Sequence, residues 1–77
     1  MAEDGLRNTI KVERAKRDLT QAELAAMAGI TRRSVNAIEG GRMVPSVFLA
    51  LKIARSLGVD VETIFSLDGG TQPSFRR

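Results

Sequence analysis

The strongest constraint on the fold of this chain is a pair of helix-start signals on either side of Gly29. The first lies at residues 19–24, where Thr20 and Glu23 have the spacing of a capping box and two leucines form a hydrophobic staple around it. Gly29 follows at a position where helices commonly end in a left-handed residue. The second signal begins at once, because Thr31 can cap another helix. The sequence therefore predicts two short helices separated by only two residues.

The remaining helix signals predict three more helices around this pair. Asn8 or Thr9 can cap a helix that runs to about Arg17, a longer helix spans 46–57, and Asp60 caps a last short one. Apolar spacing predicts the buried stripe of the longer helix. Its members are Val47, Ala50, Ile53, Ala54 and Leu57.

The chain is expected to form one domain with loose ends. Strand signals are nearly absent, although residues 6–7 and 66–67 can form a few ladder hydrogen bonds. The C-terminal residues lack apolar periodicity and include a Gly-Gly pair. We therefore expect an all-α domain of five helices over residues 8–67, a flexible N-terminal segment at 1–7 and a flexible C-terminal tail at 68–77.

Composition limits the chemistry that this chain can perform. It has no cysteine, histidine or tyrosine, which removes the thiolate nucleophile, the imidazole base and the soft zinc ligands. We therefore expect neither an enzyme nor a bound metal or cofactor. No apolar run approaches the ~18 residues of a membrane span, and the acidic start does not resemble a signal peptide. We expect no membrane partner and a cytoplasmic location.

Positive charge is carried mainly by arginine, with nine arginines, three lysines and a net charge of +3. The planar guanidinium matches phosphate and guanine, which favours anionic partners. The basic residues form one cluster at 7–17 and another at 32–42. Each cluster is either a solvated helical face or a surface for an anionic partner, and composition alone leaves both open.

The second helix of the pair carries polar side chains on its outward face. Val35 and Ile38 share the inward face. The outward face carries Arg32, Arg33, Asn36 and Ala37. Two short helices with this pattern are typical of a helix-turn-helix, whose second helix enters the major groove of DNA. Arginine can donate two hydrogen bonds to guanine, and asparagine can pair with adenine in the same way. Many all-α proteins also contain two capped helices around a glycine.

The run LTQAELAAMAGITRRSVNAIEGGRMVPSVFLALKIARSLGVDVETIF, within residues 10–67, resembles a known family. It is similar to the Cro/CI-type helix-turn-helix regulators of bacteria and phages, also called the XRE family. Short stand-alone members carry the motif S-R-x-x-I-N-x-I-E-x-x-K/R, then P-S, then L-x-x-A-L-K-I-A. The resemblance implies a lambda-repressor-like fold in which helices 2 and 3 form the helix-turn-helix, with a recognition helix at residues 31–40.

The resemblance also implies roles for particular residues. Gln21 matches a glutamine that hydrogen-bonds a DNA phosphate and braces the recognition helix, although a first-turn glutamine can also be merely solvent-exposed. Arg42 matches a basic residue that touches phosphate, and whether Arg32 or Arg33 contacts a base is left open. The DNA-binding residues implied in this way are Gln21, Thr31, Arg32, Arg33, Ser34, Asn36, Ala37 and Arg42.

One implied pair is structural. Arg14 and Glu39 match residues that form a partly buried ion pair in phage repressors and tie helix one to the end of helix three. Breaking such a pair costs about 3–5 kcal/mol when burial is complete. Arg14 is therefore not expected to contact DNA.

The sequence departs from the family pattern at three positions. Asp18 replaces a preferred glycine in the turn before helix two, which is tolerable because aspartate visits left-handed conformations. Val44 replaces a residue that is often polar, which puts a DNA contact from this loop in doubt. Phe48 replaces a charged or polar residue and is expected to be exposed, which invites a partner protein.

Two functions from different classes follow. The first is a sequence-specific regulator of double-stranded DNA, a repressor that binds an inverted-repeat operator as a homodimer. Its dimer surface is expected at Ile64, Phe65 and Leu67. The second is a protein-binding module, such as an antitoxin-like or adaptor domain, which Phe48 and Leu67 favour. An enzyme is a distant third.

Overall fold

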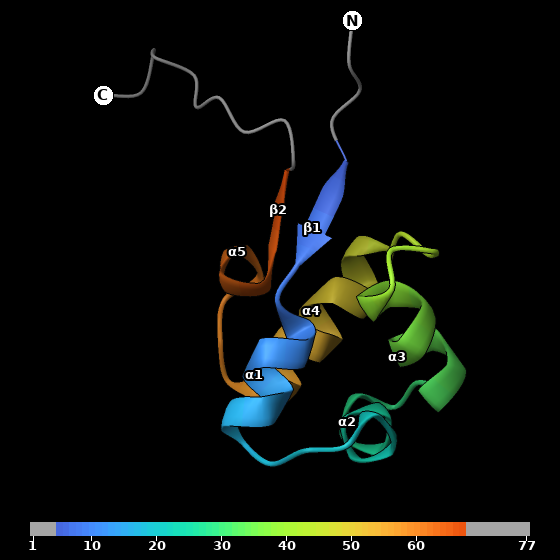
Figure 1. Cartoon of the computed structure of the whole chain (residues 1–77), viewed down its shortest axis with the longest axis vertical. Helices are drawn as coiled ribbons and strands as arrows, with labels where there is room; N and C mark the ends of the chain where they lie inside the picture. Colours follow the sequence, from blue (N-terminus) through green and yellow to red (C-terminus); the bar gives the residue numbers. More distant parts are fainter. Residues whose placement is uncertain (1–4, 68–77) are drawn as a thin grey trace, which may run out of the picture.

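The structure, a computed structural model, describes residues 5–67 and contains five helices. Figure 1 shows them surrounding a common centre, with a small two-stranded sheet at one end. Among residues 5–67 no helix has the length and apolar character needed to cross a membrane. The all-α expectation of five helices is confirmed. The elements are β1 Leu6–Asn8, α1 Ile10–Lys16, α2 Gln21–Ala28, α3 Arg32–Glu39, α4 Val47–Leu57, α5 Val61–Ile64 and β2 Phe65–Leu67.

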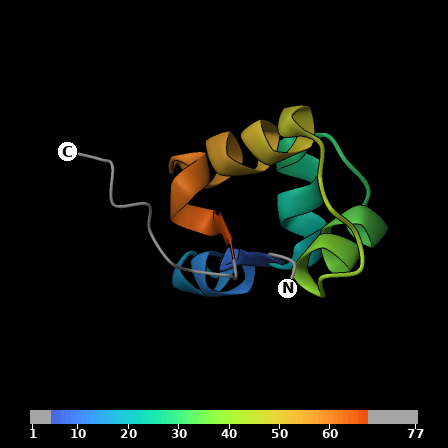
Figure 2. The ribbon, with the colours of Figure 1, turned by 90° about the horizontal axis from the view of Figure 1, so that it is seen from above.

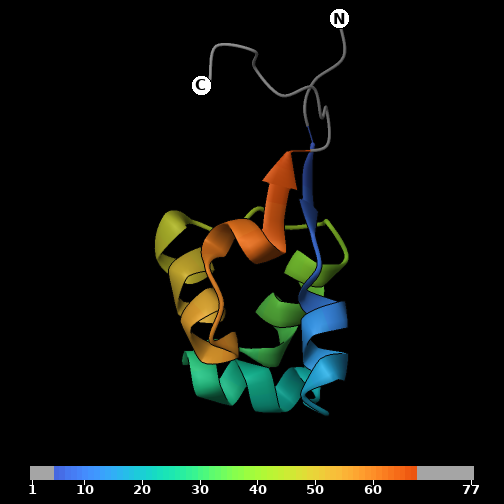
Figure 3. The ribbon, with the colours of Figure 1, turned by 90° about the vertical axis from the view of Figure 1, so that its left-hand side faces the viewer.

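The small sheet joins the two ends of the described chain. β1 and β2 are antiparallel, with Leu6 opposite Leu67 and Asn8 opposite Phe65. They lie side by side and project from the helices, as Figures 1 and 3 show. The ladder expected between residues 6–7 and 66–67 is therefore present, and the expectation of a flexible segment at 1–7 is wrong for residues 6 and 7. Residues 1–4 and the expected flexible tail at 68–77 lie outside the described residues.

The two helices around Gly29 form as their signals predict. In the capping box of α2, the Glu23 N–H donates to Thr20 Oγ1 (3.0 Å) and the Thr20 N–H donates to Glu23 Oε1 (2.8 Å). Gly29 adopts a left-handed φ of 70° and ends α2. Thr31 then caps α3 by accepting the Ser34 N–H at 3.0 Å. Local hydrogen bonds and the left-handed conformation of Gly29 thus mark where α2 ends and α3 begins.

The turn before α2 also follows the prediction. Asp18 has a φ of 58°, the left-handed conformation in which glycine is preferred and aspartate is tolerated. The main-chain N–H of Leu19 then donates to the Arg14 carbonyl at 2.9 Å. The chain can therefore reverse between α1 and α2 without a glycine.

One core binds the helices together, and α4 packs across α2 on the side away from α1 (Figure 2). The buried stripe of α4 begins at Ala50. Val47 is 76% exposed, so its predicted burial is wrong. It is the first residue of α4, one turn before the stripe, and no described element covers it. The fully buried side chains of the core are Ile10, Leu24, Val35, Ile38, Ile53 and Ile64.

Candidate nucleic-acid interface

Helix α3 is seated on the core by two apolar side chains and exposes its polar ones. Val35 and Ile38 are fully buried. Arg32, Arg33 and Asn36 are exposed on the other side, as the periodicity predicts. Within residues 5–67 the two arginine side chains have no hydrogen-bond or ion-pair partner. Their guanidinium groups are therefore available to a ligand.

The first turn of α3 uses its hydroxyl groups internally. The Thr31 hydroxyl donates to the Ser34 hydroxyl at 2.9 Å while it caps the helix. Ser34 is only half-exposed, and so is Ala37, which we expected on the outward face. The longer polar groups on this surface of α3 therefore belong to Arg32, Arg33 and Asn36. The shorter side chains between them belong to Thr31, Ser34 and Ala37.

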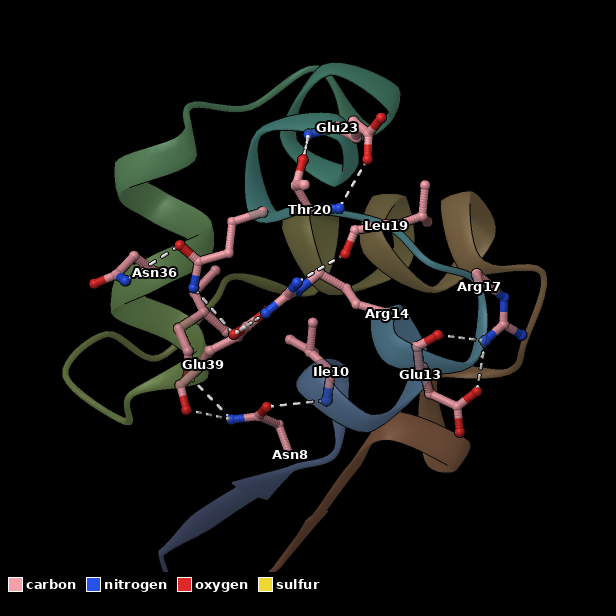
Figure 4. Close-up of polar contacts among 12 residues, drawn as sticks. Asn8, Ile10, Glu13, Arg14, Arg17, Leu19, Thr20, Glu23, Asn36 and Glu39 are labelled. Carbon is pink, nitrogen blue, oxygen red and sulfur yellow. Dashed lines mark hydrogen bonds and ion pairs between the residues drawn. The ribbon is translucent and has the colours of Figure 1, made fainter.

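The end of α3 is held by the predicted ion pair between Arg14 and Glu39. Arg14 Nε and Nη2 donate to the two carboxylate oxygens of Glu39 at 2.6 and 3.0 Å. Arg14 Nη1 also donates to the Leu19 carbonyl at 2.8 Å, so its guanidinium lies between α1, α3 and the turn before α2 (Figure 4). Only 14% of the Arg14 side chain and 8% of the Glu39 side chain are exposed. The ion pair is thus a largely buried link between α1 and α3.

The charge of Glu39 is stabilised by these neighbours. Burial alone raises the pKa of this carboxyl. Hydrogen bonds from Arg14 and Gln21 outweigh burial, and the charges of Arg14 and Lys11 add to them, so the pKa lies below its ordinary value. In return, the hydrogen bond to Glu39 raises the pKa of Arg14. The pair remains ionised at neutral pH. Because the positive charge of Arg14 compensates the negative charge of Glu39, the end of α3 carries no unpaired carboxylate at this position.

Three predicted DNA-binding residues extend this network outward. Gln21, the first residue of α2, donates from Nε2 to Glu39 Oε1 at 3.1 Å. Asn36 Nδ2 donates to Gln21 Oε1 at 3.2 Å. Arg42, in the loop after α3, donates from Nη2 to Asn36 Oδ1 and to the Asn36 carbonyl oxygen, the latter at 3.2 Å. The structure therefore brings Gln21, Asn36 and Arg42 together, and Gln21 does brace α3.

A polar hollow of 220 Å³ lies beside this network. Its lining includes Lys11 of α1, which sequence reasoning placed only in a basic cluster. Its position beside Glu39 could be inferred from the helical spacing of 11 and 14 together with the Arg14–Glu39 pair. The residues that line the hollow are Lys11, Gln21, Asn36, Glu39, Gly40 and Arg42.

The first basic cluster is largely explained by internal pairs. Arg17 Nη1 donates to Glu13 Oε1 at 2.8 Å, and Lys16 Nζ lies 3.3 Å from Glu13 Oε2. The hydrogen bond from Arg17 is the main reason that the pKa of Glu13 is lowered. With Arg14 paired to Glu39, these three cations have structural partners. Lys11 is the member of the cluster that faces the hollow.

Asn8 is a structural residue whose link to α3 the sequence did not reveal. Its Oδ1 accepts the Ile10 N–H at 3.1 Å, whereas the N-cap of α1 is Thr9, whose side chain makes no capping hydrogen bond. Asn8 Nδ2 donates to the Ile38 carbonyl at 3.0 Å (Figure 4). One side chain thus joins the first turn of α1 to the last turn of α3, and only the folded arrangement shows this contact.

The expected dimer surface needs a correction. Ile64 and Phe65 are 1% and 9% exposed within a single chain, because both belong to its own core. They are not available as a surface for a second subunit. Leu67 is 63% exposed and is the one member of that set that a partner can reach. The prediction failed because apolar spacing near a helix end does not distinguish an internal contact from an external one.

Phe48 is 68% exposed on α4, in agreement with its predicted orientation. The Lys52 ammonium lies 4.9 Å from the centre of its ring. A shallow hollow of 340 Å³ is lined by Phe48, Leu51, Lys52 and Arg55. This surface is separate from the residues presented by α3, and a role in protein contact stays a prediction.

The dimensions of α3 fit double-stranded DNA. An α-helix is about 10–12 Å across, and the major groove is about 12 Å wide. Arg32, Arg33 and Asn36 lie on the side of α3 that such an approach would place against base edges. The polar hollow lies beside this side of α3, with Asn36, Glu39 and Gly40 in its lining.

Comparison with known proteins gives concordant results. The chain matches the family model described as Helix-turn-helix over residues 10–64. It is 47% identical over 64 residues to an uncharacterized HTH-type transcriptional regulator of Methanothermobacter thermautotrophicus, which covers 82% of this chain and 93% of the relative. It is 45% identical over 60 residues to the uncharacterized HTH-type transcriptional regulator MJ0272 of Methanocaldococcus jannaschii, covering 78% of this chain and 91% of that protein.

A solved structure shows the same arrangement of elements. The restriction-modification controller protein C.AhdI from Aeromonas hydrophila superposes with a TM-score of 0.68 at 28% sequence identity. The alignment covers 70% of this chain and 82% of that one. The family match spans α1 to α5 and therefore includes both helices around Gly29.

Proposed function

Because this chain belongs to the helix-turn-helix family of the Cro/CI type, whose members are DNA-binding transcriptional regulators, we propose that it is a sequence-specific repressor. In this proposal it binds an inverted-repeat operator as a homodimer and inserts α3 into the major groove. The observation that carries the proposal is the division of α3 into a buried side, Val35 and Ile38, and an exposed side, Arg32, Arg33 and Asn36.

Sequence recognition is assigned to the exposed side of α3. Arg32 and Arg33 lie at the N-terminal end of α3, and their guanidinium groups are unpaired among residues 5–67. This is the end that reaches base edges in helix-turn-helix proteins. One of them donates to guanine, and Asn36 pairs with adenine. Thr31, Ser34 and Ala37 line the same surface and approach the sugar-phosphate edge or the groove floor.

Backbone binding is assigned to the polar hollow. Gln21 and Arg42 were implied as phosphate contacts, and Lys11 adds a third donor beside them. Phosphate contacts fix the position of a protein on DNA but carry no sequence information of their own. The pairing of Glu39 with Arg14 favours this contact, because an unpaired carboxylate in the hollow would repel phosphate.

The homodimer is proposed to form around Leu67. This side chain is exposed beside Leu6, its partner across the sheet. Both line an apolar hollow of 480 Å³ that includes Val44 and Met43. Two-fold symmetry would set two copies of α3 about 34 Å apart, one turn of DNA. Occupancy of such a site excludes other proteins from it, and we propose that repression acts in this way.

Selection of bound fragments from random DNA tests this proposal. We expect an enriched motif with two inverted half-sites separated by about one helical turn. Binding to it should weaken steeply as salt rises from 50 to 200 mM, by about 10³-fold or more if six or more phosphates are contacted. No enrichment, together with weak binding that is equal on all sequences, would refute sequence-specific recognition.

Sedimentation at tens of micromolar tests the dimer separately. We expect a dimer for the natural chain and a monomer for Leu67→Asp, because a carboxylate would be buried at the centre of the proposed contact. Ser66→Asp, at the neighbouring exposed position of β2, is the matched control and should stay dimeric. A natural chain that sediments as a monomer at this concentration would remove the homodimer from the proposal.

A protein-binding module is the second candidate, and the exposed Phe48 favours it. Such a module would bind DNA weakly, without a preferred sequence and with no saturation. The Phe48→Ser variant separates the two functions. A DNA regulator should keep its operator affinity within about twofold, since Phe48 lies outside the α3 surface, whereas an adaptor should lose its partner.

A further inference from the structure

We propose that Arg42 is a specificity-positioning residue, which fixes the orientation of the Asn36 amide and thereby its preference for one base. Gly40 makes this contact possible by leaving room for the Arg42 guanidinium. The inference rests on the proposed function, because it assigns Asn36 to a base pair. It differs from the phosphate contact implied for Arg42, which would act equally on all sequences.

The orientation of the amide follows from the two charged ends of the network. Glu39 is a carboxylate held ionised by Arg14, so it can only accept hydrogen bonds. Gln21 must therefore turn its NH₂ group toward Glu39, which leaves Gln21 Oε1 as an acceptor for Asn36. Any other orientation of Gln21 would place two oxygens against each other.

The other end imposes the same polarity on Asn36. Arg42 carries a guanidinium, which can only donate. It donates to Asn36 Oδ1 and to the Asn36 carbonyl oxygen, while Asn36 Nδ2 donates to Gln21. A reversed Asn36 amide would place its NH₂ group against the guanidinium, so that two donors face each other. It would also place its oxygen against Gln21 Oε1, so that two acceptors face each other. Arg42 therefore closes a chain of hydrogen bonds with only one consistent direction.

The fixed amide keeps the capacity that a base requires. Each amide group has two donor hydrogens and two acceptor lone pairs, and the network uses one donor and one lone pair of the side chain. One donor and one acceptor remain, which is the complement of adenine N7 and N6. Because the amide cannot rotate without breaking two hydrogen bonds, it is preorganised for one arrangement of the base and penalises the others.

Gly40 provides a substitution that removes this contact and keeps both of its partners. A Cβ on Gly40 would overlap Arg42 Nη1 and lie 3.0 Å from its Cζ. Its other neighbour, the Asn36 carbonyl oxygen at 3.3 Å, requires only a small shift. Gly40 has φ −82° and ψ 0°, which alanine adopts without strain. Gly40→Ala should therefore push the flexible guanidinium away from Asn36 and leave α3 intact.

The test measures the DNA affinity of the natural chain, of G40A, of R42A and of the double variant. Each protein is measured on the selected operator and on operators in which each base pair is changed in turn. We expect G40A and R42A each to lower discrimination at the same adenine-containing base pair by about fivefold or more, the lower range for one bidentate base contact. The double variant should lose no more than R42A alone. Arg55→Ala, an exposed arginine on α4, is the matched control for lost charge and should leave discrimination unchanged.

Three results would overturn the inference. One is a loss in R42A that is equal on all sequences and accompanied by a lower salt slope, which would make Arg42 a phosphate contact only. Another is a further loss from G40A in the R42A background, since the glycine would then act by a different route. The third is unchanged discrimination at the adenine-containing base pair in both G40A and R42A. A natural chain with no base preference would instead refute the proposed function.

A measurement on the free protein checks the positioning itself. Nitrogen-15 relaxation of the Asn36 side-chain amide should report a restrained group in the natural chain. The same amide should be mobile in G40A and R42A, with unchanged thermal unfolding for G40A showing that the fold is retained. An Asn36 amide that is equally mobile in all three proteins would refute the role of Arg42.

Discussion

Replacing Arg14 by methionine is predicted to destabilise the fold more than loss of a surface charge would. The substitution removes both donors from Arg14 to Glu39 and leaves this carboxylate with Gln21 as its remaining hydrogen-bond donor. Removing one partner of a fully buried ion pair costs about 3–5 kcal/mol. Because 8% of the Glu39 side chain and 14% of that of Arg14 still reach solvent, we expect about 3 kcal/mol.

This loss is large compared with the stability available. A single core in a domain of this size supplies about 3–5 kcal/mol. The Arg14→Met variant should therefore retain about 0–2 kcal/mol, and at the lower limit about half of its molecules would be unfolded. Each kcal/mol lowers the melting temperature of a 60–100-residue domain by about 4–8 °C, so we expect a decrease of about 12–24 °C.

The paired variant separates an unpaired charge from lost packing. In Arg14→Met with Glu39→Met both charges of the pair are removed, and apolar replacement of such pairs is often tolerated. We expect the double variant to recover about 2 kcal/mol relative to Arg14→Met, although Leu19 and Gln21 each lose a partner. Urea unfolding followed by circular dichroism provides the free energies. Single-variant costs below about 1 kcal/mol, or costs that simply add, would show that the pair behaves as an exposed surface pair.

Three further predictions concern stability. Glu39 has a lowered pKa when folded, so the unfolded chain binds the carboxyl proton more readily than the folded chain does. The stability contributed by Glu39 should be full above about pH 4.5 and should fall as the pH drops through the folded pKa. Thermal unfolding measured across an acid titration should show this fall in the natural chain and a smaller fall in Glu39→Gln. Thr31→Ala should cost about 1 kcal/mol in urea unfolding, since it removes the cap of α3, and a cost near zero would argue against the cap. Val47→Lys should change stability by less than about 0.5 kcal/mol, whereas Ile53→Ala should cost about 2–5 kcal/mol in the same urea assay. Similar costs for the two variants would contradict the exclusion of Val47 from the buried side of α4.

The features that the sequence predicted well depend on residues close together in the chain. Thr20 and Glu23 are three positions apart and form their capping box without help from the rest of the molecule. Gly29 and Thr31 likewise end one helix and start the next through local conformation. The Arg14–Glu39 pair spans 25 positions, and it was predicted only because the chain resembles a family in which that pair occurs.

The features that were missed depend on which elements meet in space. Ile64 and Phe65 have the same apolar character whether they face their own core or a second subunit. The hydrogen bond from Asn8 to Ile38 crosses 30 positions and has no local signal. The contact between Arg42 and Asn36 needs the space above Gly40, which the sequence presents only as one of two adjacent glycines at a helix end.

Base reading by the exposed polar face of α3 is the central claim about this protein. The decisive measurement is the binding free energy of Arg32→Ala and Arg33→Ala on the selected operator and on its single-base-pair variants. At least one variant should lose about 1–3 kcal/mol on the operator and become indifferent to the identity of one base pair. Equal losses on every sequence for both variants would show that neither arginine contacts a base, and would contradict this account of α3.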